Sequence, residues 1–184
     1  MHDPLSYDDV EALDAFARTP KAHRAEAAKL LAWAAETTPD DEVSEAELVS
    51  AAAWHLGQAG ETEAALDLRR RAVEADGQCT PDARSELHAA LLEAGRAEEA
   101  RQVADAFRRS RPRLEDVADM ASTFEMAGDL QQAHRWVEMG VSRLDLADEA
   151  DDYAVIQLRN VRRLVRRQLG FPPDELDELD DDGR

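Results

Sequence analysis

The sequence predicts an all-α protein, and three features lead to this class. Alanine, leucine, glutamate and arginine, which are good helix formers, dominate the 184 residues together with aspartate. Runs of β-branched residues, which would indicate strands, do not occur in the sequence. Three glycines, Gly60, Gly95 and Gly128, lie 35 and 33 residues apart, each at the same place in a repeated pattern. A period near 34 residues predicts an α-solenoid of antiparallel helix pairs.

The repeat extends over four columns of residues. An alanine follows each glycine after five residues, a large apolar residue precedes it by four, and another apolar residue precedes that one by four. These columns hold Ala65, Ala100 and Ala133, then Leu56, Leu91 and Phe124, and finally Ala52, Leu87 and Met120. Because one helix pair cannot bury its apolar face alone, neighbouring pairs stack and leave an extended surface that suits binding.

Residues 1–44 form an N-terminal helical extension in this prediction. A first helix covers Tyr7 to about Arg18, and Pro20 opens a second helix that runs to about Glu36. A threonine pair followed by a proline then breaks the helix, because the residue before a proline disfavours helical geometry.

Three helix pairs follow over residues 45–146, giving about nine helices in all. Ser44 followed three residues later by Glu47 is a capping-box signature, which marks the start of the first pair. In each pair the repeat glycine ends the first helix, and the second helix folds back antiparallel to it. The predicted pairs are 45–59 with 61–76, 81–94 with 96–110, and 113–127 with 129–146.

A C-terminal capping helix within residues 147–170 differs from the others because it is strongly basic. Its predicted apolar stripe consists of Ile156, Leu158, Val161, Leu164, Val165 and Leu169. The rest of its surface carries Arg159, Arg162, Arg163, Arg166 and Arg167. Acidic segments flank the helix on both sides, so we expect these arginines to neutralise the chain's own acids. The alternative is that they contact RNA or an acidic protein.

The acidic tail, residues 171–184, is expected to be disordered, because its charge is high and its apolar content low. Phe171, Leu176 and Leu179, spaced among the acids, leave a second interpretation open. The tail would then be a short motif that docks on another protein, or back on the chain's own arginines in competition with a ligand.

The net charge of −19, from 41 acidic and 22 basic side chains, limits the classes of partner. Such a chain repels phosphate backbones and anionic membranes at long range, so neither nucleic acid nor a membrane is expected as a partner. No stretch approaches 18 uncharged apolar residues, and no basic patch followed by an apolar run opens the sequence. We therefore expect a cytoplasmic protein. The alanine-rich, arginine-rich composition suggests a high-GC bacterial genome.

The repeated pattern over residues 45–146 resembles the tetratricopeptide repeat family. The landmarks that carry the resemblance are the apolar columns, the turn glycines and the alanines described above; the first copy adds Ala72, where the later copies have Phe107 and Gly140. The family's tryptophan near the start of the first helix is absent from all three copies. The resemblance implies a right-handed superhelix that binds proteins or peptides. The asparagine and lysine clamp of the co-chaperone members is not present here, since Asn160 is the only asparagine and neither lysine lies in the repeats.

In such superhelices the first helix of each pair lines the concave face, and its outward positions form the candidate binding groove. In this sequence those candidates are Glu47, Ser50, Trp54, Gln58, Asp82, Ser85, Leu92, Glu93, Glu115, Ser122, Glu125 and Met126. An acidic groove with one large aromatic favours a basic or arginine-bearing peptide, through charge steering and a stacked cation. The alternative for Trp54 is a packing role, and Trp33 and Trp136 are expected in the core.

Nothing in the sequence indicates an enzyme, a metal site or a cofactor. The histidines do not occur in a metal-ligand motif, the glycines are isolated turn residues, and Cys79 is the only cysteine. We therefore expect a non-catalytic adaptor or scaffold that binds a protein or peptide. The alternatives are a self-associating structural subunit, such as a homodimer, and a regulatory protein that senses a peptide.

Overall fold

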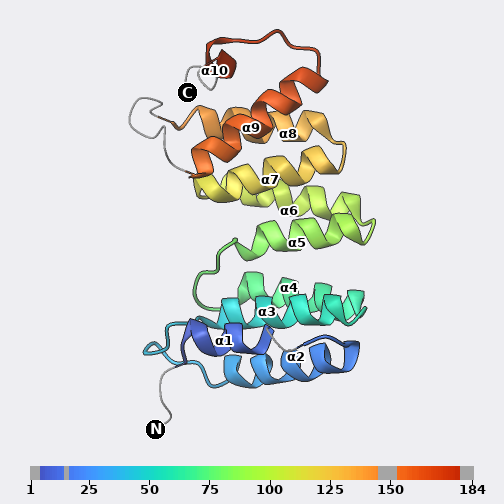
Figure 1. Cartoon of the computed structure of the whole chain (residues 1–184), viewed down its shortest axis with the longest axis vertical. Coiled ribbons are helices and arrows are strands. Elements are labelled where there is room, and N and C mark those ends of the chain that lie inside the picture. The colour runs from blue at the N-terminus through green and yellow to red at the C-terminus, as the bar shows by residue number, and fades with distance from the viewer. Residues whose placement is uncertain (1–4, 15–16, 145–152, 179–184) are drawn as a thin grey trace. The chain divides into compact units, whose positions relative to one another are not determined.

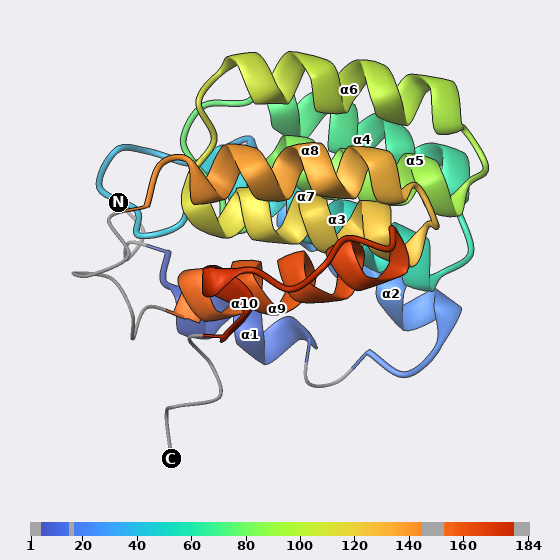
Figure 2. The same ribbon diagram turned by 90° about the horizontal axis from the view of Figure 1, so that it is seen from above.

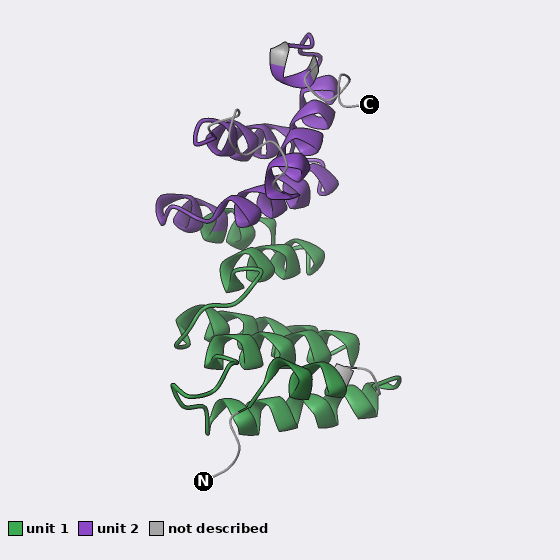
Figure 3. Cartoon of the chain, turned by 60° about the vertical axis from the view of Figure 1, so that its left-hand side comes forward, with its two compact units in different colours: residues 1–103 green, residues 104–184 purple. Residues whose placement is uncertain are grey.

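The computed structural model describes residues 5–14, 17–144 and 153–178, and all regular secondary structure in these ranges is helical. This confirms the all-α class. Ten helices occur in the described residues, and the last of them is a single turn. The chain divides into two compact units, Met1–Val103 and Ala104–Arg184 (Figure 3).

Unit 1 is a series of helices in which each one packs on the next. Within it α2 packs on α3, α3 on α4, and α4 on α5 (Figure 1). Leu30, Leu48 and Val49 lie in its first core cluster, and Leu87 and Leu91 lie in a second. The helices are α1 (Tyr7–Asp14), α2 (Pro20–Ala34), α3 (Glu45–Gln58), α4 (Thr62–Glu74), α5 (Ala83–Glu93) and the first half of α6 (Ala97–Arg109).

The local signals that define the helix pairs act as the sequence predicts. Ser44 caps α3 in a capping box, because its hydroxyl accepts from the Glu47 N–H while the Glu47 carboxylate accepts from the Ser44 N–H. Gly60, Gly95 and Gly128 have φ of 80°, 73° and 79°, a left-handed conformation that costs glycine little. After each of them the next backbone N–H bonds a carbonyl five residues earlier, at 2.8 to 2.9 Å, which is the Schellman arrangement of a helix end.

Unit 2 has one core formed by helices on both sides of α8. Phe107 of α6, Phe124 and Trp136 are at most 1% exposed, and the ring centroids of Phe107 and Trp136 are 6.0 Å apart. The helix α9 packs on both α7 and α8 (Figure 2). The helices are the second half of α6, α7 (Leu114–Met126), α8 (Leu130–Val141), α9 (Tyr153–Gln168) and α10 (Glu175–Glu178).

The predicted apolar stripe of α9 is wrong at two positions. Ile156 and Leu164 are each 44% exposed, whereas Arg159 and Arg162 are buried. The buried face follows Val155, Leu158, Arg162 and Val165, spaced three and four residues apart, and so includes an arginine that a stripe of apolar residues alone leaves out.

Two further predictions about burial have mixed outcomes. Trp136 lies in the core as expected, whereas Trp33 is only half-buried and packs at the edge of the first core cluster.

The described part of the tail, residues 171–178, differs from the expected disorder, because it ends in α10 and is held by ion pairs to α9. Residues 179–184 lie outside the described residues. Among the helices that are described, none is long and apolar enough to cross a membrane.

Candidate functional site

Trp54 is the most prominent exposed side chain of unit 1 among the predicted groove residues. It projects from α3 with 42% of its surface exposed, although its neighbours Ala53 and His55 on that helix are buried. Two imidazoles contact its ring edge to face. The ring centroid of His23, from α2, lies 5.7 Å from that of Trp54, and the ring centroid of His55 lies 5.0 Å from it. The Nδ1 atoms of His23 and His55 are 2.8 Å apart, so the two imidazoles are hydrogen-bonded to each other. The indole is therefore held in place while part of it remains open to solvent.

A first hollow of about 340 Å³ lies on one side of Trp54, between α1, α3 and the loop that precedes α5. One of its two acidic groups is Glu47, whose Oε1 accepts a hydrogen bond of 2.9 Å from the Tyr7 hydroxyl. This bond to a carboxylate raises the pKa of Tyr7. Since the other oxygen of Glu47 serves the capping box of α3, both carboxylate oxygens are fixed in position. The lining residues are Tyr7, Val10, Val43, Glu47, Ser50, Ala51, Trp54, Cys79, Thr80, Pro81 and Glu86.

A second hollow of about 320 Å³ lies on the other side of Trp54, between α3, α4 and α5. Glu93 is exposed there, and it makes no ion pair with any residue the structure describes. Arg69 of this hollow is paired at 2.6 Å with Glu86, which lines the first hollow. That pair cancels one acidic group, so Glu47 and Glu93 leave the surface around Trp54 negative. The lining residues are Ala53, Trp54, Gly57, Gln58, Thr62, Ala65, Leu66, Arg69, Ala90, Glu93 and Ala94.

The structure brings together four of the predicted residues of unit 1, namely Glu47, Trp54, Gln58 and Glu93. We call this set, with its two hollows, the Trp54 surface. Of the remaining predicted residues of unit 1, Ser50 lines the first hollow but is almost completely covered, and Asp82, Ser85 and Leu92 line neither hollow.

Their positions have clear physical reasons. Ser50 and Ser85 are each only 7% exposed, and the Ser50 hydroxyl donates to Glu86 of α5 instead of facing a ligand. Asp82 caps α5 and is held by the Arg84 guanidinium at 2.6 Å. Leu92 is half-buried against the second core cluster.

The other four predicted residues belong to α7 in unit 2. Met126 is 77% exposed and Glu115 is exposed, whereas Ser122 is half-buried. Glu125 accepts a hydrogen bond of 2.7 Å from the Gln168 side chain of α9. A groove that runs through both units stays a prediction.

The chemistry available in the described residues is limited. No group of three histidine, cysteine, aspartate or glutamate side chains is placed there to hold a metal ion. Burial raises the pKa of the Cys79 thiol to about 11, so this cysteine is a poor nucleophile at neutral pH. Burial also lowers the pKa of His88 to about 4, which keeps its imidazole neutral.

Sequence reasoning missed the support of Trp54 by His23 and His55, because the two histidines are 32 residues apart and belong to no motif. It also missed the bond between Tyr7 and Glu47, which joins the N-terminal extension to the first repeat. No protein-family model matches this sequence, and no curated protein or solved structure gives a significant match to it.

Proposed function

We propose that this chain is a non-catalytic helical-repeat adaptor, similar to tetratricopeptide repeat proteins, whose Trp54 surface binds an arginine-bearing segment of a partner protein. The observation that carries the proposal is the exposed indole, held between two hollows. An exposed tryptophan in a fixed orientation loses little conformational entropy on binding, and tryptophan is among the residues that most often dominate binding energy.

The charges near Trp54 favour a cationic ligand. Glu47 lies at one hollow and Glu93 at the other, so a bound cation would have a carboxylate on either side of the indole. A guanidinium stacks on an aromatic face and forms forked hydrogen bonds to carboxylates, which a lysine ammonium does less well. Each hollow is near the lower limit of about 300 Å³ for small-molecule sites, so it suits one or two side chains rather than a cofactor.

The proposal is tested by selecting peptides from a random display library with the intact chain. We expect the selected peptides to contain arginine, and Trp54→Ala to weaken their binding by about tenfold to a hundredfold in titration calorimetry. Trp54→Phe should keep part of the affinity, and Glu93→Gln should slow association and reduce its dependence on salt.

Tyr153→Ala is the matched control, because Tyr153 is an aromatic residue of α9 with 79% exposure and is not part of the Trp54 surface. It should leave peptide binding unchanged. Selected peptides without basic residues, or binding that Trp54→Ala does not weaken, would contradict the proposal. A molecular mass that rises with concentration and falls back in Trp54→Ala would instead support the self-associating subunit.

A further inference from the structure

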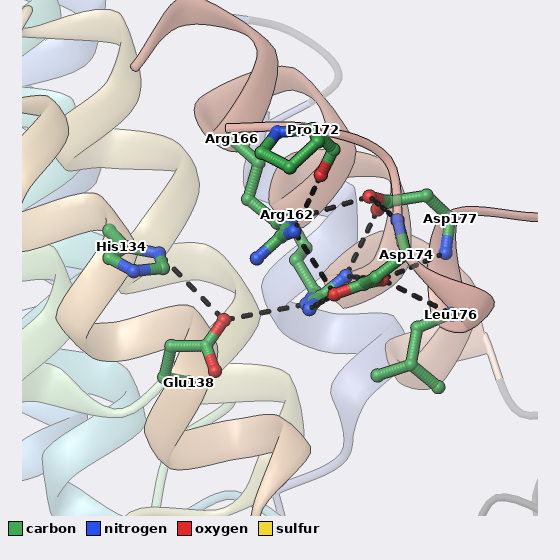
Figure 4. A network of polar contacts seen from close by, with 8 residues as sticks. All are labelled: His134, Glu138, Arg162, Arg166, Pro172, Asp174, Leu176 and Asp177. Atoms are coloured by element: carbon green, nitrogen blue, oxygen red, sulfur yellow. Dashed lines mark hydrogen bonds and ion pairs between the residues drawn. The ribbon is translucent and has the colours of Figure 1, made fainter. Parts of the chain in front are cut away.

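The segment that follows α9 returns onto that helix and is held there by arginines. The guanidinium of Arg162 bonds Asp174 at 2.6 and 2.9 Å and Asp177 at 3.0 Å, and its Nε lies 3.4 Å from the Glu138 carboxylate of α8 (Figure 4). The Arg162 side chain is only 5% exposed. The hydrogen bonds from Arg162 hold the pKa of Asp174 well below its usual range. This segment is therefore fixed by charge-assisted bonds.

Arg166, one turn after Arg162, completes the attachment. Its guanidinium contacts both Asp174 and Asp177, at 3.1 and 3.3 Å, and donates to the Pro172 carbonyl at 2.8 Å. It also lies 5.5 Å from the centre of the Phe171 ring. Arg162 and Arg166 thus form an inner pair of arginines, spaced i and i+4, that the chain's own aspartates occupy.

A hollow of about 970 Å³ lies beside this attachment, between α9 and residues 170–173. One part of its wall is apolar, formed by Leu164, Phe171 and the two prolines, and Leu164 and Phe171 are each 44% exposed. The other part is basic. The complete lining consists of Asn160, Arg163, Leu164, Arg166, Arg167, Gly170, Phe171, Pro172, Pro173 and Asp177.

Arg163 and Arg167 form a second, outer pair with the same i and i+4 spacing as the inner pair. Both are exposed, and Arg167 makes no ion pair with the part of the chain that the structure describes. Arg163 donates to the Asn160 side chain at 3.1 Å. The outer pair lies next to exposed apolar groups, so the ligand that complements it has carboxylates about one helical turn apart and an apolar side chain.

The chain's own tail shows that α9 binds carboxylates at this spacing. Its docked turn has the sequence Asp174-Glu175-Leu176-Asp177, with two aspartates three residues apart and a leucine between them. The same four residue types follow at once in the sequence, as Asp177-Glu178-Leu179-Asp180. An acidic turn is therefore a chemistry that this helix already binds in one of its two arginine pairs, through Asp174 and Asp177.

We propose that the hollow of α9 binds an acidic, leucine-bearing segment of a partner protein, whose carboxylates pair with Arg163 and Arg167 while its leucine contacts Leu164 and Phe171. The docked tail forms one wall of this site through Pro172, Pro173 and Asp177. The site uses other residues than the Trp54 surface and does not depend on the function proposed for that surface.

The test measures binding of a fluorescent peptide with the sequence of residues 173–182 to the full chain, by fluorescence anisotropy. We expect saturable binding that weakens as salt rises from about 50 to 300 mM, since screening acts on exposed charges. Arg163→Gln combined with Arg167→Gln should raise the dissociation constant at least about fivefold, because two exposed ion pairs are lost. A Leu164→Gln variant should weaken binding as well.

The matched control combines Arg109→Gln with Arg135→Gln, which makes the same change in charge. Both residues are exposed, belong to unit 2 and do not line the hollow, so this variant should bind the peptide as the wild type does. A peptide with amides in place of all carboxylates should not bind. All four arginines are exposed on the surface, so circular dichroism should show the same melting for both variants.

Three results would overturn the proposal. The first is no binding of the acidic peptide, and the second is equal binding by the amide peptide. The third is an equal loss of binding in both arginine variants, which would mean that net charge and not the hollow attracts the peptide. If instead the molecular mass of the wild type rises with concentration and that of the Arg163→Gln, Arg167→Gln variant does not, the hollow binds a second copy of this chain and not another protein.

Discussion

The polar side chains buried in the two units differ in kind. Among the described residues, unit 1 buries hydroxyls and imidazoles, from Ser50, His55, Ser85 and His88. Unit 2 buries a carboxylate and two guanidiniums, from Asp116, Arg159 and Arg162. A buried charge is costly unless it is paired, whereas a buried imidazole can remain neutral. The two units therefore depend on different conditions: unit 1 needs a neutral interior, and unit 2 needs intact ion pairs.

Two of the buried charges of unit 2, Asp116 and Arg162, are held in ion pairs. Asp116, in the first turn of α7, accepts bonds of 2.9 and 3.2 Å from Arg113, and the helix dipole favours an acid there. Arg162 has three carboxylates around it, from α8 and from the segment after α9. The ion pairs of Arg162 therefore tie α9 to α8 and to the segment that follows α9, whereas the pair of Asp116 is local to the start of α7.

The largest difference in stability between the units should come from the protonation of His88 in unit 1 at acidic pH. Its pKa is about 4 in the folded chain, against an ordinary value of 6.5. Between these values the unfolded chain binds more protons than the folded chain, so the free energy of unfolding falls as the pH falls from 6.5 to about 4. We expect a loss of at most about 3 kcal/mol over this range, measured by urea unfolding at several pH values.

His88→Gln removes this titration while keeping a polar side chain at the position. Whatever its stability at neutral pH, its free energy of unfolding should change less between pH 6.5 and 4 than that of the wild type. An unchanged pH slope in His88→Gln would show that the interior of unit 1 is not the source of the acid sensitivity.

The next prediction compares one glycine-to-alanine substitution in each unit. The substitution should lower the stability of unit 2, where the glycine is closely packed, and raise that of unit 1, where it is not. Gly140 in α8 is buried, and a Cβ added there would lie 2.5 Å from the Leu158 side chain of α9 and 3.0 Å from Val117. Leu158 is fully buried and has little room to move, so Gly140→Ala should destabilise unit 2 by about 2 kcal/mol.

Gly57 in α3 provides the matched substitution in unit 1. It lies in a helix, is exposed, and a Cβ added there would meet no atom within 4 Å. Gly57→Ala should therefore stabilise the chain by about 0.5 to 1 kcal/mol, because alanine is the better helix former. Thermal unfolding of both variants measures the contrast, and a stabilising Gly140→Ala would refute the tight contact between α8 and α9.

The sequence was sufficient to predict the features that depend on local chemistry. The capping box of Ser44 and Glu47 fixed the start of α3, and the repeat glycines fixed three helix ends, since both signals act within a few residues. The replacement of the repeat's late alanine by Gly140 was visible in the sequence, but its reason was not. That reason is the approach of Leu158, which lies 18 residues further along the chain.

The candidate site could be predicted only in part, because burial on a helix face depends on what packs against it. Trp54 and Glu93 lie on the surface as expected, whereas Ser50 is covered and bonded to Glu86 of α5. On α9, the apolar pattern predicts a stripe that leaves out Arg162, which the structure buries. An arginine becomes suitable for burial only once partner carboxylates are in place, and those of Arg162 come from α8 and from beyond α9.

The smallest effect on global stability should come from replacing one buried charge of unit 2, that of Arg162, by an apolar side chain. Arg162→Met keeps most of the volume but removes only one partner of these ion pairs, which is costly where the remaining charge stays buried. Here Asp174 and Glu138 are already 39% and 45% exposed and Asp177 reaches water once the segment after α9 is released, so we expect a change within about 1 kcal/mol. Locally the effect should be large, because Asp174 and Asp177 lose their main partner. Hydrogen exchange of residues 171–178 should therefore become fast in Arg162→Met.

Arg167→Met is the control, since this arginine is exposed and pairs with none of the described acids. It should leave the exchange of residues 171–178 slow. In the wild type the same release should require acid, and the sign follows from the lowered pKa of Asp174: its contribution is present above the usual aspartate pKa of 3.8 and is lost as the pH falls below it. The tail should then stay docked through the range in which His88 titrates. Release of the tail between pH 6.5 and 4, together with the loss of stability in unit 1, would mean that the two units do not respond to acid separately.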